Sequence, residues 1–100
     1  MEIPVGPVDE IPDGGVTIVQ SGSLFVGVYR IGEQLFAIED RCSHDDGPLC
    51  EGDRDGFCIE CPRHGATFDV RTGDVLSLPA TEGVDTFPVT VRDGEVFVDV

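Results

Sequence analysis

The sequence contains no lysine, and its six basic residues are all arginine, against twenty acidic residues. The formal net charge is −14. Such a surface repels phosphate backbones and anionic lipids, so we expect neither nucleic acid nor membrane as a partner. A protein partner with a basic docking face fits better, because opposite charges steer the encounter. The alternative is that the acidity only keeps a small protein in solution.

The sequence also lacks a long apolar run. Residues 1–10 contain no basic segment followed by an apolar stretch, so they do not resemble a signal peptide, and no segment approaches the length that spans a bilayer. We therefore predict a cytoplasmic protein, with residues 1–100 forming one domain around a modest core. In a reducing compartment its four cysteines favour metal binding over disulfides.

No segment shows a convincing helical period of 3.6 residues, because glycine and proline interrupt the chain frequently. Short β-branched and alternating runs instead predict an all-β fold, a small antiparallel sandwich or barrel with one hairpin-like insert. The expected strands are residues 16–20, 24–31, 35–39, 57–60, 66–70, 86–92 and 95–100, with a short edge strand at 3–5.

Two dipeptides predict tight hairpin turns. Gly32-Glu33 has glycine first and indicates a type II′ turn, whereas Asp93-Gly94 indicates type I′. The two arms around the second turn alternate apolar and polar residues, which predicts that one face of each arm is buried. The residues expected in the core are Phe87, Val89, Val91, Val96, Val98 and Val100.

All four cysteines and both histidines lie between residues 41 and 65. They form two clusters, Cys42-Ser43-His44 and Cys61-Pro62-Arg63-His64, with sixteen residues between them. Each cluster offers one thiolate and one imidazole, and a glycine follows within a few residues. Closely spaced Cys and His on two loops suit a metal centre that prefers nitrogen and sulfur ligands.

The pattern C-x-H, sixteen residues, then C-x-x-H-G resembles the signature of Rieske [2Fe–2S] proteins, in which two His replace two Cys on one iron. The resemblance implies a Rieske-like fold with a cluster-binding subdomain inserted between strands. It also implies one [2Fe–2S] cluster, with the cysteines on the buried iron and the histidines on the exposed one. The implied cofactor-binding and metal-ligating residues are Cys42, His44, Cys61 and His64, on loops at about 41–50 and 61–66, and a proline loop at about 76–83 contains Pro79.

Ligation by two Cys and two His explains why Rieske clusters have a higher reduction potential than the clusters of plant-type ferredoxins. With two thiolates and two neutral imidazoles the oxidised cluster carries no net charge, and one electron makes it −1. In high-potential members of the family, a Ser and a Tyr hydroxyl donate to the cluster sulfurs. Those positions are Ala66 and Phe68 here, which predicts a potential near the bottom of the Rieske range.

Two other metal sites use the same segment. A Cys₂His₂ zinc site could take the same four ligands, although zinc sites usually pair Cys with Cys and His with His. A Cys₄ site would add Cys50 and Cys58, but its spacing is not that of plant-type ferredoxins. Otherwise these two cysteines are most simply buried thiols, or they pair with each other.

The absence of certain motifs argues against an oxygenase and against a nicotinamide- or flavin-binding enzyme. The two histidines are both used by the cluster, so none remains for an oxygenase iron, and no G-x-G-x-x-G supports nicotinamide or flavin binding. The segments E-D-R-C-S-H, E-C-P-R-H-G and R-T-G resemble the Rieske-type ferredoxins of bacterial ring-hydroxylating dioxygenase systems. That resemblance implies a one-electron carrier rather than an enzyme, passing electrons from a flavin-dependent ferredoxin reductase to a terminal oxygenase.

Three alternatives remain open from the sequence. The chain could be the small Rieske-like subunit of a nitrite reductase, or a Rieske protein that serves iron–sulfur assembly. A zinc-binding interaction module is the non-redox alternative. The colour and metal content of the purified protein separate the last of these from the others.

Overall fold

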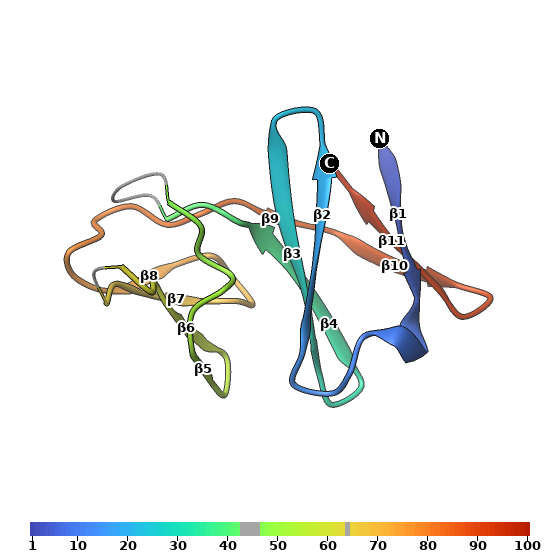
Figure 1. Ribbon diagram of the computed structural model, residues 1–100, viewed down its shortest axis with the longest axis horizontal. Helices are drawn as coiled ribbons and strands as arrows, with labels where there is room; N and C mark the ends of the chain where they lie inside the picture. Colours follow the sequence, from blue (N-terminus) through green and yellow to red (C-terminus); the bar gives the residue numbers. More distant parts are fainter. Residues whose placement is uncertain (43–46, 64) are drawn as a thin grey trace.

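The computed structural model describes residues 1–42, 47–63 and 65–100 (Figure 1). Within these residues all of the regular secondary structure is strand apart from a single 3₁₀ turn, η1 (Val8–Glu10). The strands form three sheets, and every strand pair in them is antiparallel. The predicted all-β class is therefore confirmed.

Two of the sheets form a part of the molecule that we call the base. One has the strand order β1-β11-β10, and the other has the order β2-β3-β4-β9. The strands of the first sheet are β1 (Glu2–Pro7), β10 (Val89–Arg92) and β11 (Glu95–Asp99). Those of the second are β2 (Val16–Ser21), β3 (Leu24–Ile31), β4 (Gln34–Glu39) and β9 (Thr86–Phe87).

The third sheet lies in residues 40–85, between β4 and β9, and we call this segment the insert. It occupies the opposite end of the molecule from the β10–β11 turn (Figure 1). The sequence predicted a hairpin-like insert, whereas the structure has four short strands in the order β5-β6-β7-β8. They are β5 (Arg54–Asp55), β6 (Cys58–Glu60), β7 (Thr67–Asp69) and β8 (Val75–Ser77).

The two predicted hairpin turns are confirmed. Gly32 adopts φ 64° in the two-residue loop between paired Ile31 and Gln34, as type II′ requires of its first central residue. Asp93 and Gly94 adopt φ 52° and 78°, the two positive values of a type I′ turn. Among the described residues, Asp93 is the only non-glycine residue with a positive φ.

Other local predictions need correction. The edge strand predicted at residues 3–5 is longer, and it pairs with β11 over most of its length. The predicted proline loop begins inside a strand, because β8 extends to Ser77. Val91 was expected in the core but is 47 % exposed, although its paired residue Val96 on the same face is buried, because Val91 lies on the edge strand β10 next to the β10–β11 turn.

The β2-β3-β4-β9 sheet is covered on both faces, which explains the nearly continuous apolar run of β3. Successive strand residues point to opposite faces. Val26 and Val28 therefore enter a core shared with β11, while Tyr29 enters a second core shared with the insert. Ala37 and Ile38 on β4 divide in the same way.

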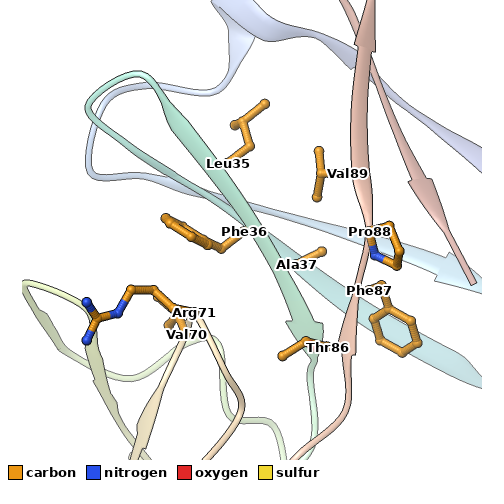
Figure 2. Close-up of a pocket in the computed structure, with 9 residues that line it drawn as sticks. All are labelled: Leu35, Phe36, Ala37, Val70, Arg71, Thr86, Phe87, Pro88 and Val89. Carbon is orange, nitrogen blue, oxygen red and sulfur yellow. The ribbon is translucent and has the colours of Figure 1, made fainter.

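The base meets the insert at an aromatic junction. The ring of Phe36 on β4 lies 5.8 Å from that of Phe57 in an edge-to-face arrangement, and the Arg71 guanidinium lies 4.2 Å from the Phe57 ring centre. An open pocket of about 400 Å³ lies beside this junction (Figure 2). Its lining residues are Leu35, Phe36, Ala37, Val70, Arg71, Thr86, Phe87, Pro88 and Val89. Arg71 is bound to Asp69 at 2.8 Å, so this pocket presents no uncommitted charge to a ligand.

Candidate metal centre

Cys42 follows β4 at the entry to the insert. The end of the strand is fixed by two backbone bonds, in which Glu39 N–H donates to Asp85 and Asp40 N–H donates to Phe25. The Cys42 N–H then donates to the carbonyl oxygen of Gly47 at 2.8 Å, across the loop. The Cys42 side chain has no exposed surface. The bonds at the end of β4 and the bond to Gly47 therefore fix the backbone that places this thiol in the interior.

Cys61 follows β6 and begins the second loop. Its N–H donates to the Ala66 carbonyl at 2.7 Å, and its own carbonyl accepts from Gly65 N–H at 3.0 Å. Gly65 adopts φ 77°, a conformation that favours glycine, and this explains the H-G pair of the motif. Cys61 is 1 % exposed, so the second thiol is also delivered into the interior.

The two loops are held against each other at their bases. Glu60 N–H donates to the Asp53 carbonyl at 2.8 Å, which joins the strand before Cys61 to the segment that follows the first loop. Gly52 lies so close to this strand that a Cβ would collide with the carbonyl oxygen of Glu60. Only glycine allows this approach, so Gly52 helps to hold the two loops together. Gly52 lies outside both Cys/His motifs, and the sequence therefore gave no indication of this role.

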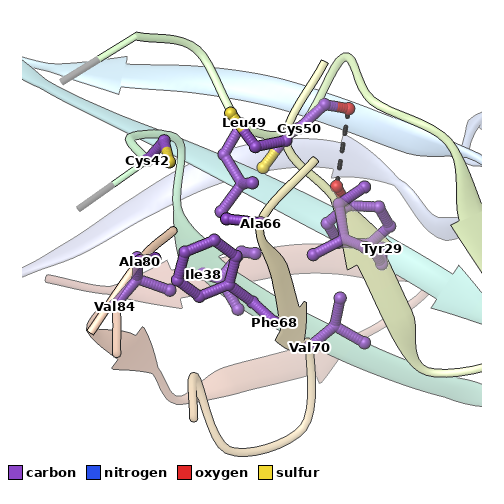
Figure 3. Close-up of a cluster of buried hydrophobic side chains, with 12 residues drawn as sticks. Tyr29, Ile38, Cys42, Leu49, Cys50, Ala66, Phe68, Val70, Ala80 and Val84 are labelled. Atoms are coloured by element: carbon purple, nitrogen blue, oxygen red, sulfur yellow. Dashed lines mark hydrogen bonds between the residues drawn. The ribbon is translucent and has the colours of Figure 1, made fainter. Parts of the chain in front are cut away.

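Both thiols belong to the same hydrophobic core, in which Figure 3 shows Cys42, Ala66 and Phe68. The predicted proline loop contributes Ala80 to this core, while Leu78 beside it is 75 % exposed. Two buried thiols from two adjoining loops are soft donors in a dry site, which fits an iron–sulfur cluster. The predicted ligands His44 and His64 lie outside the described residues.

The all-cysteine alternative is wrong. All four cysteines are among the described residues, and within that part of the chain no three His, Cys, Asp or Glu side chains gather closely enough to hold a metal ion. Cys50 and Cys58 also form no disulfide. Cys50 is buried as predicted, whereas Cys58 is only half-buried.

The chain matches the Rieske [2Fe-2S] domain family over residues 1–88. It belongs to this family. The cofactor is therefore one Rieske [2Fe–2S] cluster, as the Cys-x-His and Cys-x-x-His motifs predicted.

Individual relatives specify the family further. The ferredoxin subunit of 3-phenylpropionate/cinnamic acid dioxygenase from Photorhabdus laumondii is 40 % identical over 93 % of this chain and 89 % of its own. The ferredoxin of carbazole 1,9a-dioxygenase from Nocardioides aromaticivorans IC177 superimposes with a TM-score of 0.92 at 33 % identity, covering 98 % of this chain and 96 % of its own. A chain in the complex of reduced oxygenase and oxidized ferredoxin of carbazole 1,9a-dioxygenase gives a TM-score of 0.92 at 40 % identity, with coverages of 97 % and 91 %.

These likenesses make the chain a ferredoxin, an electron-transfer component rather than a catalytic enzyme. Its fold is that of the solved Rieske ferredoxins. In the described part of the chain, no helix is long and apolar enough to cross a membrane.

Beyond the motif, this Rieske domain uses Cys50 as a packing residue. Its Sγ lies directly over Gly27 of β3, where a Cβ would collide with it, so the strand needs glycine at this position. Cys50 is 2 % exposed, and burial raises the pKa of its thiol to about 12. A neutral thiol of this kind is a small apolar side chain, not a reactive one.

Tyr29 lies beside Cys50 in the same core. Its hydroxyl donates to the Cys50 carbonyl at 3.4 Å (Figure 3), and burial raises the pKa of the phenol far above its ordinary value. The phenol is therefore neutral and serves as a donor. Neither this contact nor the glycine beneath Cys50 could be predicted from the motif, because both partners lie more than twenty residues away in sequence.

Proposed function

We propose that this ferredoxin carries one electron at a time in the cytoplasm, from a flavin-dependent ferredoxin reductase to a terminal ring-hydroxylating oxygenase. In this proposal residues 1–100 act as one domain, and the cluster is held by Cys42, His44, Cys61 and His64. The single observation that carries the ligand set is the placement of the two thiols. Both are buried in one core, at the start of two loops that contact each other at their bases.

Their burial suits Cys42 and Cys61 to hold the cluster through thiolates in a dry site. A thiolate without a compensating charge is costly in an apolar site, so these two positions are favourable for thiolates only when a metal shares their charge. When bound, the cluster accepts or releases one electron. The surrounding Leu49, Ala66 and Phe68 side chains exclude water from the sulfur side of the site.

The proposed partners follow from the relatives and from the charge of the chain. Relatives are named as ferredoxin subunits of dioxygenases, and one solved complex pairs such a ferredoxin with its oxygenase. With a net charge of −14, we expect the docking faces of both partners to be basic. Leu76 and Leu78 on the insert are 54 % and 75 % exposed and offer apolar contacts to a partner.

Metal analysis and spectroscopy test the cluster. The purified protein should be brown, contain about two irons per chain and negligible zinc, and give on reduction a paramagnetic resonance signal with the low average g value of mixed Cys/His ligation. Cys42→Ser and Cys61→Ser should each lose the cluster, because a hydroxyl is a poor partner for iron–sulfide. Cys50→Ala is the matched control and should keep it. A colourless protein with stoichiometric zinc would refute the assignment.

Stopped-flow kinetics test the partners. Reduction of the ferredoxin by its reductase, and its oxidation by the oxygenase, should both slow as salt is raised, because salt screens attraction between opposite charges. Rates that do not change over a tenfold range of ionic strength would show that the acidity serves solubility alone.

A further inference from the structure

The first cluster loop is closed by one carboxylate. Asp40 lies two residues before Cys42, and its Oδ1 accepts hydrogen bonds from the N–H groups of Leu49 (2.9 Å) and Cys50 (2.7 Å). The start and the end of the loop at residues 41–50 are therefore joined through a single side chain. Hydrogen bonds to a charged acceptor are among the stronger ones in proteins.

Asp40 and Cys50, the two residues that this contact joins, are each bonded to β3. Asp40 N–H donates to the Phe25 carbonyl at 2.8 Å, which fixes the backbone that carries the carboxylate. On the other side, the Cys50 carbonyl accepts from Tyr29, and the Cys50 thiol packs on Gly27. The Asp40 carboxylate thus connects two points that β3 already holds in place. Cys42 lies in the short segment between them.

The charge of Asp40 is held two residues before Cys42, on the backbone of Leu49, which belongs to the core of both thiols. Asp40 is half-buried and borders an open groove of about 430 Å³ that is lined also by Ile18, Phe25, Pro48 and Glu51. A fixed negative charge near a redox centre disfavours the addition of an electron. The same side chain therefore has two separable properties, an oxygen acceptor that closes the loop and a charge that opposes reduction.

We propose that Asp40 is a positioning residue of the cluster site. Its carboxylate oxygen closes the loop that presents Cys42, and its charge lowers the midpoint potential of the cluster. Nothing in the Cys/His motif requires an acid at this position. The inference rests on the proposed ligand role of Cys42, and loss of iron in Cys42→Ser tests that role separately.

Two substitutions separate the acceptor from the charge. Asp40→Asn keeps an oxygen acceptor and removes the charge, whereas Asp40→Ala removes both. The control is Asp93→Asn, which removes the same charge from the β10–β11 turn at the far end of the molecule (Figure 1). Asn is well suited to a type I′ turn, so this control leaves the fold intact.

The measurements use the holo-protein. Loss of visible absorbance in the presence of an iron chelator should be at least about tenfold faster in Asp40→Ala than in wild type, since the acceptor of two hydrogen bonds is lost. Asp40→Asn should restore a rate near that of wild type. Protein-film voltammetry should give a higher midpoint potential for Asp40→Asn, with a clearly larger shift than for Asp93→Asn.

The outcomes decide both parts of the proposal. Chelator loss in Asp40→Ala at the wild-type rate would overturn the closing role, and equal potential shifts in the two Asn variants would overturn the electrostatic role. Failure of Asp40→Ala to take up iron, while Asp40→Asn loads normally, supports the closing role because the two variants differ in the oxygen acceptor. Iron retained in Cys42→Ser would instead refute the ligand assignment.

Discussion

The base and the insert are stabilised in different ways. Most strands of the base have four to eight residues, and those on either side of the two-residue turns pair in continuous register. The strands of the insert have two or three residues. The core of the base contains only aliphatic residues, whereas the core next to the insert contains three cysteines. We therefore expect the base to be complete without a ligand and the insert to need the proposed cluster.

This contrast separates the part of the chain that stabilises the fold, the base, from the part that carries the proposed metal ligands, the insert. We expect the long hairpins of the base to fold without a ligand, because they supply buried apolar surface and continuous backbone bonding. In the insert, the backbone is devoted to two loops that bring donor atoms together. Its stability should therefore depend on metal binding, as in other small metal-binding units.

Removing the cluster should produce the largest effect. In the apo-protein, amide hydrogen exchange of β6 and β7 should accelerate by at least about a hundredfold, because on the proposed ligand set the metal joins the two loops. Exchange in β3 and β4 should change far less. Mass spectrometry of exchanged peptides measures this, and equal acceleration in both regions would show that base and insert form one cooperative unit.

Truncating one core residue in each region should sharpen the comparison. Phe68→Ala, beside the two thiols, should cost roughly 3–5 kcal/mol and should also lower the iron content. Ile11→Ala, in the core of the base, should cost roughly 2–5 kcal/mol but leave the iron content of the folded protein unchanged. Denaturant unfolding and iron analysis measure the two effects. Iron loss in Ile11→Ala would contradict the division between the regions.

Adding hydroxyl groups should tune the cluster without disturbing the base. Ala66 and Phe68 are fully buried in the core that contains both thiols, and neither can donate a hydrogen bond. Ala66→Ser with Phe68→Tyr should raise the midpoint potential by about 100 mV, because donors stabilise the more negative reduced cluster. Phe97→Tyr in the base is the control. A midpoint unchanged in the double variant would refute this account of the potential.

The smallest effects should come from the two cysteines outside the motif. Cys50, with its raised pKa of about 12, should resist alkylation of the native protein at neutral pH, because almost none of it is thiolate and it is buried. The half-buried Cys58 should react first. Peptide mapping after alkylation measures this.

Changing both Cys50 and Cys58 to Ala should leave the cluster spectrum intact, and iron loss would contradict their structural role.

Features set by a few neighbouring residues could be predicted from the sequence. Gly32-Glu33 and Asp93-Gly94 specify their hairpin turns, because each turn needs particular φ values that glycine and aspartate tolerate. The paired Cys-x-His and Cys-x-x-His spacings indicated the family and its cofactor. Turn dipeptides and ligand spacings both depend on residues close together in the sequence, so they can be recognised without knowing which segments pack against them.

Other features depended on which sheets stack on one another. Val91 shares a face with Val89 and with the buried Val96 but is exposed, because it lies on the edge strand of the β1-β11-β10 sheet next to the turn. Gly27, Tyr29 and Asp40 reach the first cluster loop only because β3 and the end of β4 lie beneath it. The sequence by itself determined the turns and the metal-binding chemistry. The tertiary structure decided which side chains hold that chemistry in place, because contacts between distant segments leave no periodic pattern in the chain.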